Sequence, residues 1–366
     1  MNDPSSAGLA ETIAEKIRQM INDGRLQHTL PGERELGHRL SVGRETVRKA
    51  LIIMEQNGDI SAPRLKTPRK ILRPASHPCR TVSSGTREIG FLTSRSLQKL
   101  PQSAMVELYT LSKIMEEDDI SIRIHDAPWL LGPNPDKRLT KLVEQSGCAC
   151  WILHRTSEQT QIWFKKHGIP CIVRGSAYPS SSLPYLDKHW VATTNHAARY
   201  LWSKGHKTVG LCLPPDPLKG HQLMQKGFFE FQGQGWTPVL IPSPMETPAF
   251  FENLTRVFAQ HPDMSALVAA RGNQTVALFS WAEMNSMIIP DQLSLLSLSY
   301  EPFMDRLLPS VAYYNDNLNK TVHKLVRMLR GIMAGRRLRS LDVIPELHEG
   351  QSVVRNRHSR PDGHQG

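Results

Sequence analysis

The sequence predicts an α/β protein with a small helical domain at its N-terminus and a larger domain built on parallel sheets. Two observations predict this fold. Apolar residues recur at helical spacing through the first 60 residues, whereas from residue 87 onward short apolar runs alternate with amphipathic segments. Residues 73–86 between these regions are rich in proline and serine and show no apolar periodicity. We therefore expect domains over 1–72 and 87–354, a linker at 73–86 and a disordered tail at 355–366.

The N-terminal region is predicted to form three helices followed by a hairpin. The first helix carries an apolar stripe and ends near Asp23-Gly24; the stripe consists of Leu9, Ile13, Ile17, Met20 and Ile21. A second helix over 33–40 and a third beginning at Arg44 flank a short turn at 41–43, and Asn57-Gly58 ends the third. Residues 60–72 contain four cations and no acid, as in a short basic hairpin. Together these elements predict a winged helix-turn-helix.

The third helix of this region has an apolar and a basic face. Helical spacing turns Val47, Ala50, Leu51 and Met54 inward, and it places Arg44, Arg48 and Lys49, with Glu45 and Thr46, on the opposite side. A basic helix presented in this way fits the major groove of DNA. The alternative is the solvated face of an ordinary helical hairpin. The turn before the helix and the elements around it favour DNA binding.

Residues 9–72 resemble the DNA-binding domain of the GntR family of bacterial regulators. The matching positions are Leu30-Pro31, Glu33-Arg34, Leu36, Val42, Arg44, Thr46-Val47-Arg48, Ala50-Leu51 and Gly58-Asp59-Ile60. The resemblance implies that Arg34, Arg44 and Arg48 contact DNA, joined by Thr46. We add the neighbouring cations Lys49, Arg64 and Lys66 as expected DNA contacts. Gly32 and Gly43 replace serines of the family pattern, which removes two hydroxyls that could contact phosphate.

Composition and charge limit the function further. The 366-residue chain has a formal net charge of +11 and a pI near 9.5, which suggests a polyanionic partner without separating DNA from RNA or membrane headgroups. No segment approaches the apolar length of a membrane span, and the N-terminus lacks the layout of a secretory signal, so we expect a cytoplasmic protein. A second basic run, from Lys320 to Arg339, is interpreted as the solvated face of a helix.

Neither a metal site nor an enzyme is expected. The five cysteines are scattered, and Cys148-Ala-Cys150 lacks the spacing of a zinc site, so we interpret them as small apolar residues in strands. The sequence contains no Gly-x-Ser-x-Gly, phosphate-binding P-loop or His-Glu-x-x-His motif. We therefore predict no catalytic residue, no metal and no cofactor, and we assign His206 a structural role at a helix-to-strand turn.

From residue 87 onward, the sequence pattern predicts strands that alternate with helices. The expected strands are 88–92, 120–124, 149–153, 170–173, 208–213, 239–242, 266–269 and 293–298, and the expected helices are 104–117, 136–145, 159–167, 192–204 and 223–233. Strands alternating with helices indicate parallel sheets with crossover helices. Such sheets bind ligands at the carboxyl ends of their strands.

Residues 87–354 resemble the effector-binding region of the LacI family, which is similar to periplasmic sugar-binding proteins (type I). The matching positions include Ala197, Leu201, Gly205-His206, His167-Gly168-Ile169-Pro170, Gly227-Phe228, Ile289-Pro290-Asp291 and Gly350-Gln351-Ser352. The resemblance implies two lobes joined by three crossovers, which close on a small molecule. The combination of both regions resembles that of bacterial arabinose-type repressors.

The expected pocket departs from the pattern of the sugar-binding members. Met224 stands where they carry an arginine, Gln274 follows Asn273 where they carry an aspartate, and Ser299 replaces another aspartate. His189 occupies a fourth such position, although Asp187 lies two residues earlier. Burying a polyol requires a partner for each hydroxyl, because an unpaired buried donor costs about 1–3 kcal/mol. We therefore do not expect a neutral sugar bound in the usual way.

Strand ends supply the candidate effector-binding residues. They are Ser94, Arg95, His154, Arg155, Arg174, Met224, Asn273, Gln274 and Ser299, with Thr93, Arg271 and Tyr300 beside them. Several are basic, which suits an anionic ligand such as a sugar acid or a phosphorylated or sulfated sugar. For each cation alone, an exposed loop position is the alternative.

These features predict a bacterial DNA-binding transcription regulator, in particular a repressor of carbohydrate-utilisation genes. We expect a homodimer on a palindromic double-stranded operator, controlled by a small-molecule effector bound between two lobes. Two alternatives stay open: the second domain binds a protein partner instead of a small molecule, or the basic chain binds nucleic acid without sequence preference.

Overall fold

The computed structural model describes residues 4–22, 26, 29–57, 59–62, 68–71, 88–132 and 134–356. The chain divides into two compact units, Met1–Arg80 and Thr81–Gly366. Each unit has its own hydrophobic core, and we describe them one after the other.

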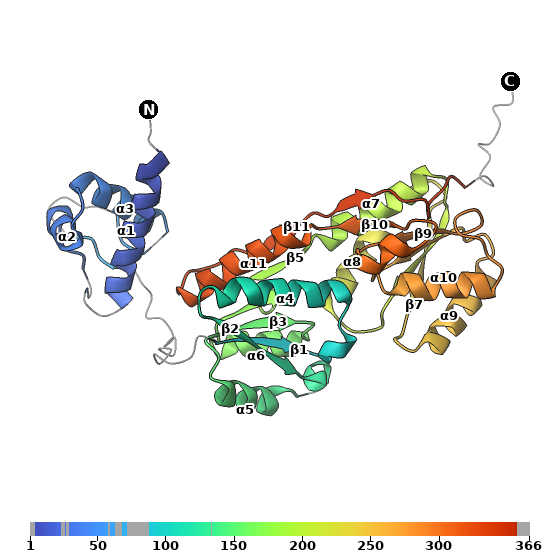
Figure 1. The fold of residues 1–366 in the computed structure, drawn as a ribbon, viewed down its shortest axis with the longest axis horizontal. Coiled ribbons are helices and arrows are strands. Elements are labelled where there is room, and N and C mark those ends of the chain that lie inside the picture. Colours follow the sequence, from blue (N-terminus) through green and yellow to red (C-terminus); the bar gives the residue numbers. More distant parts are fainter. Residues whose placement is uncertain are drawn as a thin grey trace, which may run out of the picture. The chain divides into compact units, whose positions relative to one another are not determined.

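The first unit contains three helices, α1 (Pro4–Asn22), α2 (Glu33–Leu40) and α3 (Arg44–Gln56) (Figure 1). Their apolar faces meet in one core, in which Ile17, Leu36 and Met54 are fully buried. Ser41 ends α2 in a left-handed conformation, with φ +53°, and the N–H of Val42 donates to the carbonyl of Gly37 at 3.0 Å. This turn reverses the chain sharply enough to pack α3 against both earlier helices.

Beyond α3 the chain returns along itself. Ile60 forms an antiparallel bridge with Ile71, and Lys70 forms another with Thr29. The Ile60–Ile71 bridge lies at the base of the expected hairpin, and the Lys70–Thr29 bridge joins its second arm to the segment before α2. Residues 63–67, which carry Arg64 and Lys66, lie outside the described residues.

The second unit is built on two six-stranded sheets, each forming one lobe (Figure 1). The first sheet has the order β11-β5-β4-β3-β1-β2. Its strands are β1 (Glu88–Thr93), β2 (Ser121–Asp126), β3 (Cys150–His154), β4 (Cys171–Arg174), β5 (Tyr185–Lys188) and β11 (Leu341–Val343). The second sheet has the order β12-β10-β9-β8-β6-β7. Its strands are β6 (Thr208–Leu213), β7 (Thr237–Pro242), β8 (Ala266–Ala269), β9 (Ser294–Ser297), β10 (Ala312–Asn315) and β12 (Glu346–His348).

The strands of both sheets run parallel, except that β12 pairs antiparallel with β10. The prediction of a two-lobed α/β fold with parallel sheets is thus confirmed, and the antiparallel pair is a detail that it missed. The chain passes from one sheet to the other after β5, after β10 and after β11, which gives the three expected crossovers.

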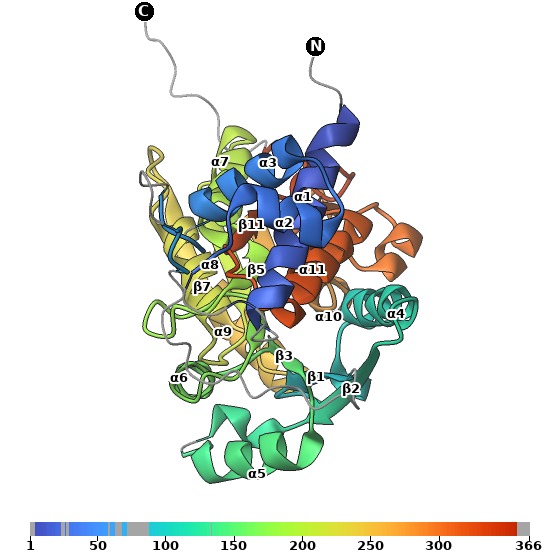
Figure 2. The same ribbon diagram turned by 90° about the vertical axis from the view of Figure 1, so that its left-hand side faces the viewer.

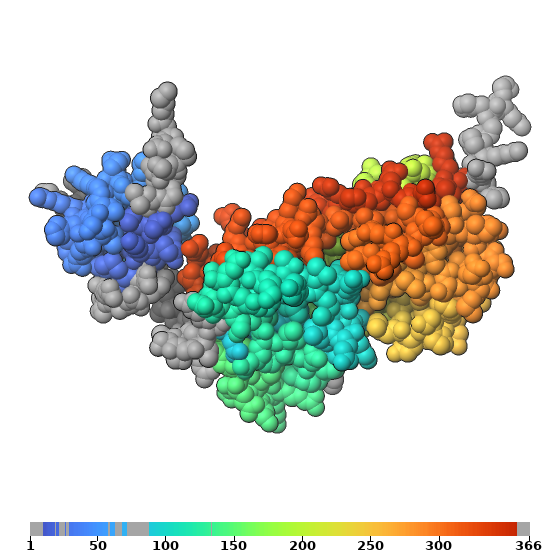
Figure 3. Space-filling view, in the orientation of Figure 1, coloured from blue at the N-terminus to red at the C-terminus, as the bar shows by residue number. Residues whose placement is uncertain are grey.

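Helices cover both faces of each sheet. The first lobe carries α4 (Gln102–Glu116) and α11 (Leu318–Met333) on one face, and α5 (Asp136–Ser146) and α6 (Glu158–Lys166) on the other. The second lobe carries α7 (Trp190–Ser203) and α8 (Lys219–Phe229) on one face, and α9 (Thr247–Gln260) and α10 (Gln274–Met284) on the other. Short 3₁₀ turns lie at Leu97–Lys99, Pro128–Leu131 and Pro302–Arg306. In the space-filling view, the segments coloured orange to red extend over both lobes of this unit (Figure 3).

One predicted helix is displaced along the chain. The sequence pattern placed it at 223–233, whereas α8 covers Lys219–Phe229. Within α8, Gly227 packs closely against α7, because a Cβ there would lie 2.2 Å from the carbonyl oxygen of Val191. The glycine therefore marks a close helix–helix contact near the C-terminal end of α8, and the helix begins four residues earlier than expected.

Several smaller expectations agree with the structure. Cys150, Cys171 and Cys212 are buried in strands, whereas Cys148 is half-buried before β3, and Cys79 lies outside the described residues. The apolar side of α11 is buried, and Lys320, Arg327 and Arg330 are exposed, as expected for a solvated helix face. The rest of the basic run differs: Lys324 is half-buried, and Arg336, Arg337 and Arg339 are exposed beyond the end of the helix. Within the described residues, every helix is too short or too polar to cross a membrane.

Candidate functional site

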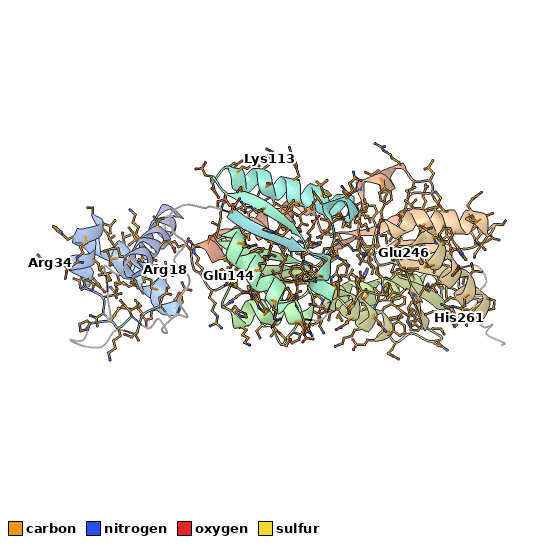
Figure 4. All side chains as sticks on the ribbon, turned by 90° about the horizontal axis from the view of Figure 1, so that it is seen from below. Arg18, Arg34, Lys113, Glu144, Glu246 and His261 are labelled. Carbon is orange, nitrogen blue, oxygen red and sulfur yellow. The ribbon has the colours of Figure 1, made fainter. Side chains whose placement is uncertain are left out.

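The basic face of α3 is exposed in the first unit. Arg44, Arg48 and Lys49 are exposed, Thr46 is half-buried, and Arg34 is exposed on α2. Figure 2 shows the three helices of this unit, and Figure 4 shows Arg34 on its outside. Among the described residues, Arg34, Arg48 and Lys49 form no ion pair. Their charges are therefore available to phosphates, and their contact with DNA stays a prediction.

Arg44 is held only loosely. Its Nε donates to Glu33 Oε2 at 3.2 Å, yet 78% of the Arg44 side chain is exposed. An exposed ion pair of this kind contributes roughly 0–1 kcal/mol. A shallow hollow between α2 and α3 lies beside it, lined by Arg34, His38, Ser41 and Arg44, among others. Arg44 can therefore change partner from Glu33 to a phosphate or base edge at little cost.

A cavity of about 260 Å³ lies between the two lobes of the second unit, lined by both. The strand ends of the first sheet contribute His154, Arg155, Arg174, Asp187 and Lys188, and the second lobe contributes Lys219, His221, Met224, Arg271, Ser299 and Asp316. Carboxyl ends of parallel strands from both sheets therefore face a common space, which is where α/β sheets bind ligands.

The candidate effector-binding residues divide into two groups. His154, Arg155, Arg174, Met224 and Ser299 line the cavity. Ser94, Arg95, Asn273 and Gln274 are absent from its lining. Whether any of them binds a ligand stays a prediction.

The second group has other positions in the structure. Ser94 is buried, and Asn273 is exposed before α10. The Oε1 of Gln274 accepts a hydrogen bond from the backbone N–H of Arg271 at 2.9 Å. Gln274 thus positions the loop that carries a lining residue rather than facing the cavity.

Three arginines converge on a single carboxylate beside the cavity. Asp216 Oδ2 accepts hydrogen bonds from Arg155 at 2.5 Å, Arg95 at 3.1 Å and Arg271 at 3.1 Å. Arg95 and Arg155 belong to the first lobe, whereas Asp216 and Arg271 belong to the second. The three arginine side chains are 12–13% exposed, so water screens their charges weakly.

The charges in this cluster shift one another's pKa values. Burial, followed by Arg271 and Arg95, lowers the pKa of Arg155 to about 9, and burial and Arg95 lower the pKa of Arg271 to about 10. Burial acts to raise the pKa of Asp216, but Arg155, Arg271 and Arg95 lower it below its ordinary value. At neutral pH the cluster therefore holds three cations and one anion.

Two neutral histidines border the same cluster. The His221 ring joins the Asp216 backbone carbonyl through Nδ1 at 3.0 Å and Arg271 Nη2 through Nε2 at 3.3 Å. This arrangement fits a ring protonated on Nδ1, with Nε2 as the acceptor. Burial, then Arg271, lowers the pKa of His221 to about 4, and burial together with Arg155 lowers the pKa of His154 well below its usual range.

A second group of lining residues contains more acids than cations. Glu107 accepts two hydrogen bonds from Arg174, at 2.5 and 2.7 Å, and Asp316 pairs with Lys188 at 3.2 Å. Asp187 accepts hydrogen bonds from the Ser176 hydroxyl and from Trp190 Nε1, and burial raises its pKa. These side chains supply the fixed acceptors and donors that a polyhydroxyl molecule needs.

Direct contacts hold the lobes together around the cavity. Glu301 accepts hydrogen bonds from the backbone N–H of Ser103 at 2.8 Å and from its hydroxyl at 2.6 Å. The Tyr178 hydroxyl donates to the Pro217 carbonyl at 2.7 Å. Together with the pairs between Asp216 and the arginines of the first lobe, these contacts stabilise the lobe arrangement of this structure.

Sequence reasoning missed several residues of this site. Asp216, His221, Lys188 and Trp190 are not among the residues that the sequence predicts, although Asp187 lies two residues before the predicted position His189. Lys188 is the last residue of β5, Trp190 begins α7 two residues later, and Asp216 lies in the loop after β6, whereas His221 lies in the first turn of α8. A search of the last residue of each strand and the three residues after it would have found Lys188, Trp190 and Asp216, but not His221. His189 itself caps α7, since its Nδ1 accepts from the Ala192 N–H at 3.2 Å.

Family models match both units. Residues 9–63 match the model of the gntR family of bacterial regulatory proteins, and residues 198–353 match the model of periplasmic binding protein-like domains. The chain joins a gntR-family DNA-binding domain to a periplasmic-binding-protein-like domain. The α3 surface thus belongs to the gntR-family domain, and the cavity to the binding-protein-like domain. A search of curated proteins gave no match.

Solved structures confirm the fold of the binding-protein-like domain. A LacI family transcriptional regulator from Bifidobacterium animalis subsp. lactis is 18% identical, with a TM-score of 0.63 over 74% of this chain and 99% of that one. A LacI family transcriptional regulator from Enterococcus faecium with bound ribose is 13% identical, with a TM-score of 0.61 over 74% and 99%. The transcriptional regulator CelR in complex with cellobiose is 12% identical, with a TM-score of 0.63 over 88% and 100%. At these identities the likeness concerns the fold, not the ligand.

Proposed function

We propose that this protein is a cytoplasmic transcription regulator that binds an operator through its gntR-family domain and a small-molecule effector through the cavity of its binding-protein-like domain. The observation that carries the proposal is the position of the cavity. It is lined by both lobes, so its occupant is able to favour one lobe arrangement over another. The chain has no need of a catalytic group for this task, and we propose a binding protein rather than an enzyme.

The exposed cations of α2 and α3 support the DNA-binding half of the proposal. In a helix-turn-helix, the second helix enters the major groove and its first residues reach base edges. Arg44 and Arg48 lie in the first turns of α3 and are exposed. We infer that Arg34, Arg44, Thr46, Arg48 and Lys49 form the DNA contact, with Arg64 and Lys66 as further candidates.

The cavity supports a compact effector. Its volume of about 260 Å³ is slightly below the usual range of about 300–1,000 Å³ for small-molecule pockets. A molecule of monosaccharide size fits this space better than an extended oligomer. The structural relatives include regulators solved with ribose and with cellobiose, which supports a carbohydrate or a carbohydrate derivative as the effector. We further propose that the protein represses carbohydrate-utilisation genes.

We propose a homodimer on a palindromic operator. One winged helix contacts a short site, and two copies spaced by one turn of DNA double the number of base contacts. The effector would then change operator affinity by changing how the two DNA-binding domains are held.

The experiment that tests the proposal begins with selection of bound sequences from random DNA, followed by affinity measurements with and without candidate carbohydrates. A regulator should prefer its selected site over random duplex by at least about a thousandfold at physiological salt. Equal affinity for both would favour a general nucleic-acid binder. Light scattering of the free and DNA-bound chain measures the dimer, and a monomer on a single half-site would contradict it. If no carbohydrate shifts the unfolding temperature, a protein-binding role for the second domain becomes the better explanation.

A further inference from the structure

The cluster around Asp216 has too few acids for its arginines. Asp216 is the one carboxylate that accepts from Arg95, Arg155 and Arg271, among the described residues. Three guanidinium groups and one carboxylate leave two positive charges in a poorly hydrated space, while the neighbouring His154 and His221 are neutral. Buried charges normally occur with a partner, because an unpaired charge loses its hydration and gains no ion pair or hydrogen bond in exchange.

The excess charge faces the cavity. Arg155 and Arg271 line it, whereas Arg95 and Asp216 do not, so the carboxylate holds the arginines from behind. The Nε of Arg155 is buried without a hydrogen-bond partner in the structure. Arg155 also adopts a left-handed backbone conformation, with φ +52°, which is uncommon for a residue with a side chain. Such conformations persist where the surrounding structure imposes them and are frequent at ligand sites.

The two lining arginines come from opposite lobes. Arg155 follows β3 in the first lobe, and Arg271 follows β8 in the second. A planar guanidinium binds phosphate or carboxylate through two parallel hydrogen bonds. An anion placed between Arg155 and Arg271 would therefore join the lobes directly.

We propose that the effector carries a phosphate or carboxylate group, which binds on the cavity side of Arg155 and Arg271 and neutralises the excess charge of the cluster. The inference rests on the proposed function, since it specifies the effector class of the same cavity. The cavity lining also provides the hydrogen-bond acceptors Glu107, Asp187 and Asp316, which match hydroxyl groups. We therefore expect the rest of the effector to be a polyhydroxyl group. The ligand is thus a sugar phosphate or a sugar acid rather than a neutral sugar.

Inorganic phosphate is the first probe. The midpoint of thermal unfolding of the full chain is followed by tryptophan fluorescence at constant ionic strength, with chloride as the reference anion. All seven tryptophans lie at residue 129 or beyond, so the fluorescence reports on the binding-protein-like domain. We expect a saturable rise in the midpoint with phosphate. In Arg155→Gln and in Arg271→Gln, the phosphate concentration for half the effect should rise at least about tenfold, since one charge-assisted contact is worth about 1.5–3 kcal/mol.

Two further variants make the test specific. Arg123→Gln removes an exposed arginine of the same lobe that pairs with Glu88, and it should respond to phosphate as the wild type does. Asp216→Asn keeps all three arginines and removes their counter-charge. It should unfold at a lower temperature in chloride and gain more from phosphate than the wild type. If Asp216 served only to fasten the lobes, phosphate would not restore the stability of this variant.

Organic probes then distinguish a phosphate group from a carboxylate group, and both from a neutral sugar. Glucose 6-phosphate, glucuronate and glucose are compared by calorimetry on the wild type and on Arg155→Gln. Tighter binding of the phosphate ester or of the acid than of glucose, lost in the variant, supports the proposal and tells which anion is preferred. Absence of any phosphate effect, or an equal effect in Arg155→Gln, overturns it. Binding of glucose alone would overturn the inference while leaving the proposed regulator intact.

Discussion

Glu301 in the second lobe accepts two hydrogen bonds from Ser103 at the start of α4 in the first lobe, one from the backbone N–H and one from the hydroxyl. The Glu301 side chain is buried, and burial raises its pKa. Because the two residues belong to different lobes, the contact joins the lobes directly.

Replacing this acid should loosen the closed arrangement. In Glu301→Ala the Ser103 N–H and hydroxyl lose their acceptor, which costs about 1–3 kcal/mol for each group that stays buried. Because opening the lobes relieves this cost by hydration, we expect a larger radius of gyration in small-angle X-ray scattering and weaker ligand binding. Asp305→Asn is the control, since Asp305 is exposed and accepts from Tyr300 within the same lobe. An unchanged radius in Glu301→Ala would show that the remaining contacts suffice for closure.

Loss of either α3 arginine should weaken operator binding without affecting the fold. Arg44→Ala or Arg48→Ala is expected to weaken binding to a selected operator by about 10- to 100-fold, since a base contact is worth about 1–3 kcal/mol. Binding is measured by electrophoretic mobility shift. Lys16→Ala, which removes an exposed cation from α1, should have a smaller effect. Equal losses in all three variants would indicate general charge attraction instead of groove recognition.

The N-terminus of α3 offers a graded test of helix capping. Gly43 has φ −63° and ψ 149°, the backbone conformation of an N-cap residue, and a Cβ there would meet nothing within 4 Å. Serine caps better than glycine by a few tenths of a kcal/mol, and alanine caps worse. Hydrogen exchange at the α3 amides should therefore slow in Gly43→Ser and quicken in Gly43→Ala. The serine hydroxyl should also tighten operator binding, because the family pattern has serine at this position. The reverse order of protection would mean that capping does not limit α3.

Acidification should destabilise the binding-protein-like domain through its buried histidines. The pKa of His221 is lowered to about 4 in the folded state, so between pH 4 and its ordinary pKa near 6.5 the unfolded chain binds more protons than the folded one. The free energy of unfolding therefore rises with pH in this window. Going from pH 7 to pH 5 should cost about 2 kcal/mol from His221 alone.

Urea unfolding followed by tryptophan fluorescence at both pH values measures this loss. His221→Gln should reduce the difference between pH 7 and pH 5 by that amount, and His323→Gln, at an exposed position on α11, should not. If His221→Gln lost as much unfolding free energy between pH 7 and pH 5 as the wild type, another group would be responsible for the proton uptake.

The fold was largely predictable because its patterns are local. The buried strands β1, β3, β6 and β8 are continuous apolar runs, and α3 and α11 have one apolar and one polar face, which periodicity detects directly. The antiparallel β12 was not predictable in the same way. It has three residues, alternates exposed and half-buried positions, and owes its direction to the last crossover.

The site was predictable only in part. Strand ends pointed to Arg155, Arg174 and Ser299, because chain order and sheet topology bring these ends to one edge. Position after a strand does not predict that the Gln274 side chain accepts from the Arg271 backbone N–H, because the direction of a side chain after a turn depends on tertiary contacts. Asp216 lies in a Pro-Pro-Asp-Pro loop without periodicity, and its importance comes from arginines 121, 61 and 55 residues away.

The last crossover also limits which fragments of the protein can fold on their own. β11 and β12 are two residues apart in the chain and lie in different sheets, and Ser352 beyond them is fully buried and donates to the Leu295 carbonyl. Neither lobe is a continuous piece of sequence, so no single cut yields an isolated half for expression. Truncation of the chain before residue 341 would remove the edge strands β11 and β12, one from each sheet. A reporter or purification tag should therefore be joined after Asn356, where both strands are kept.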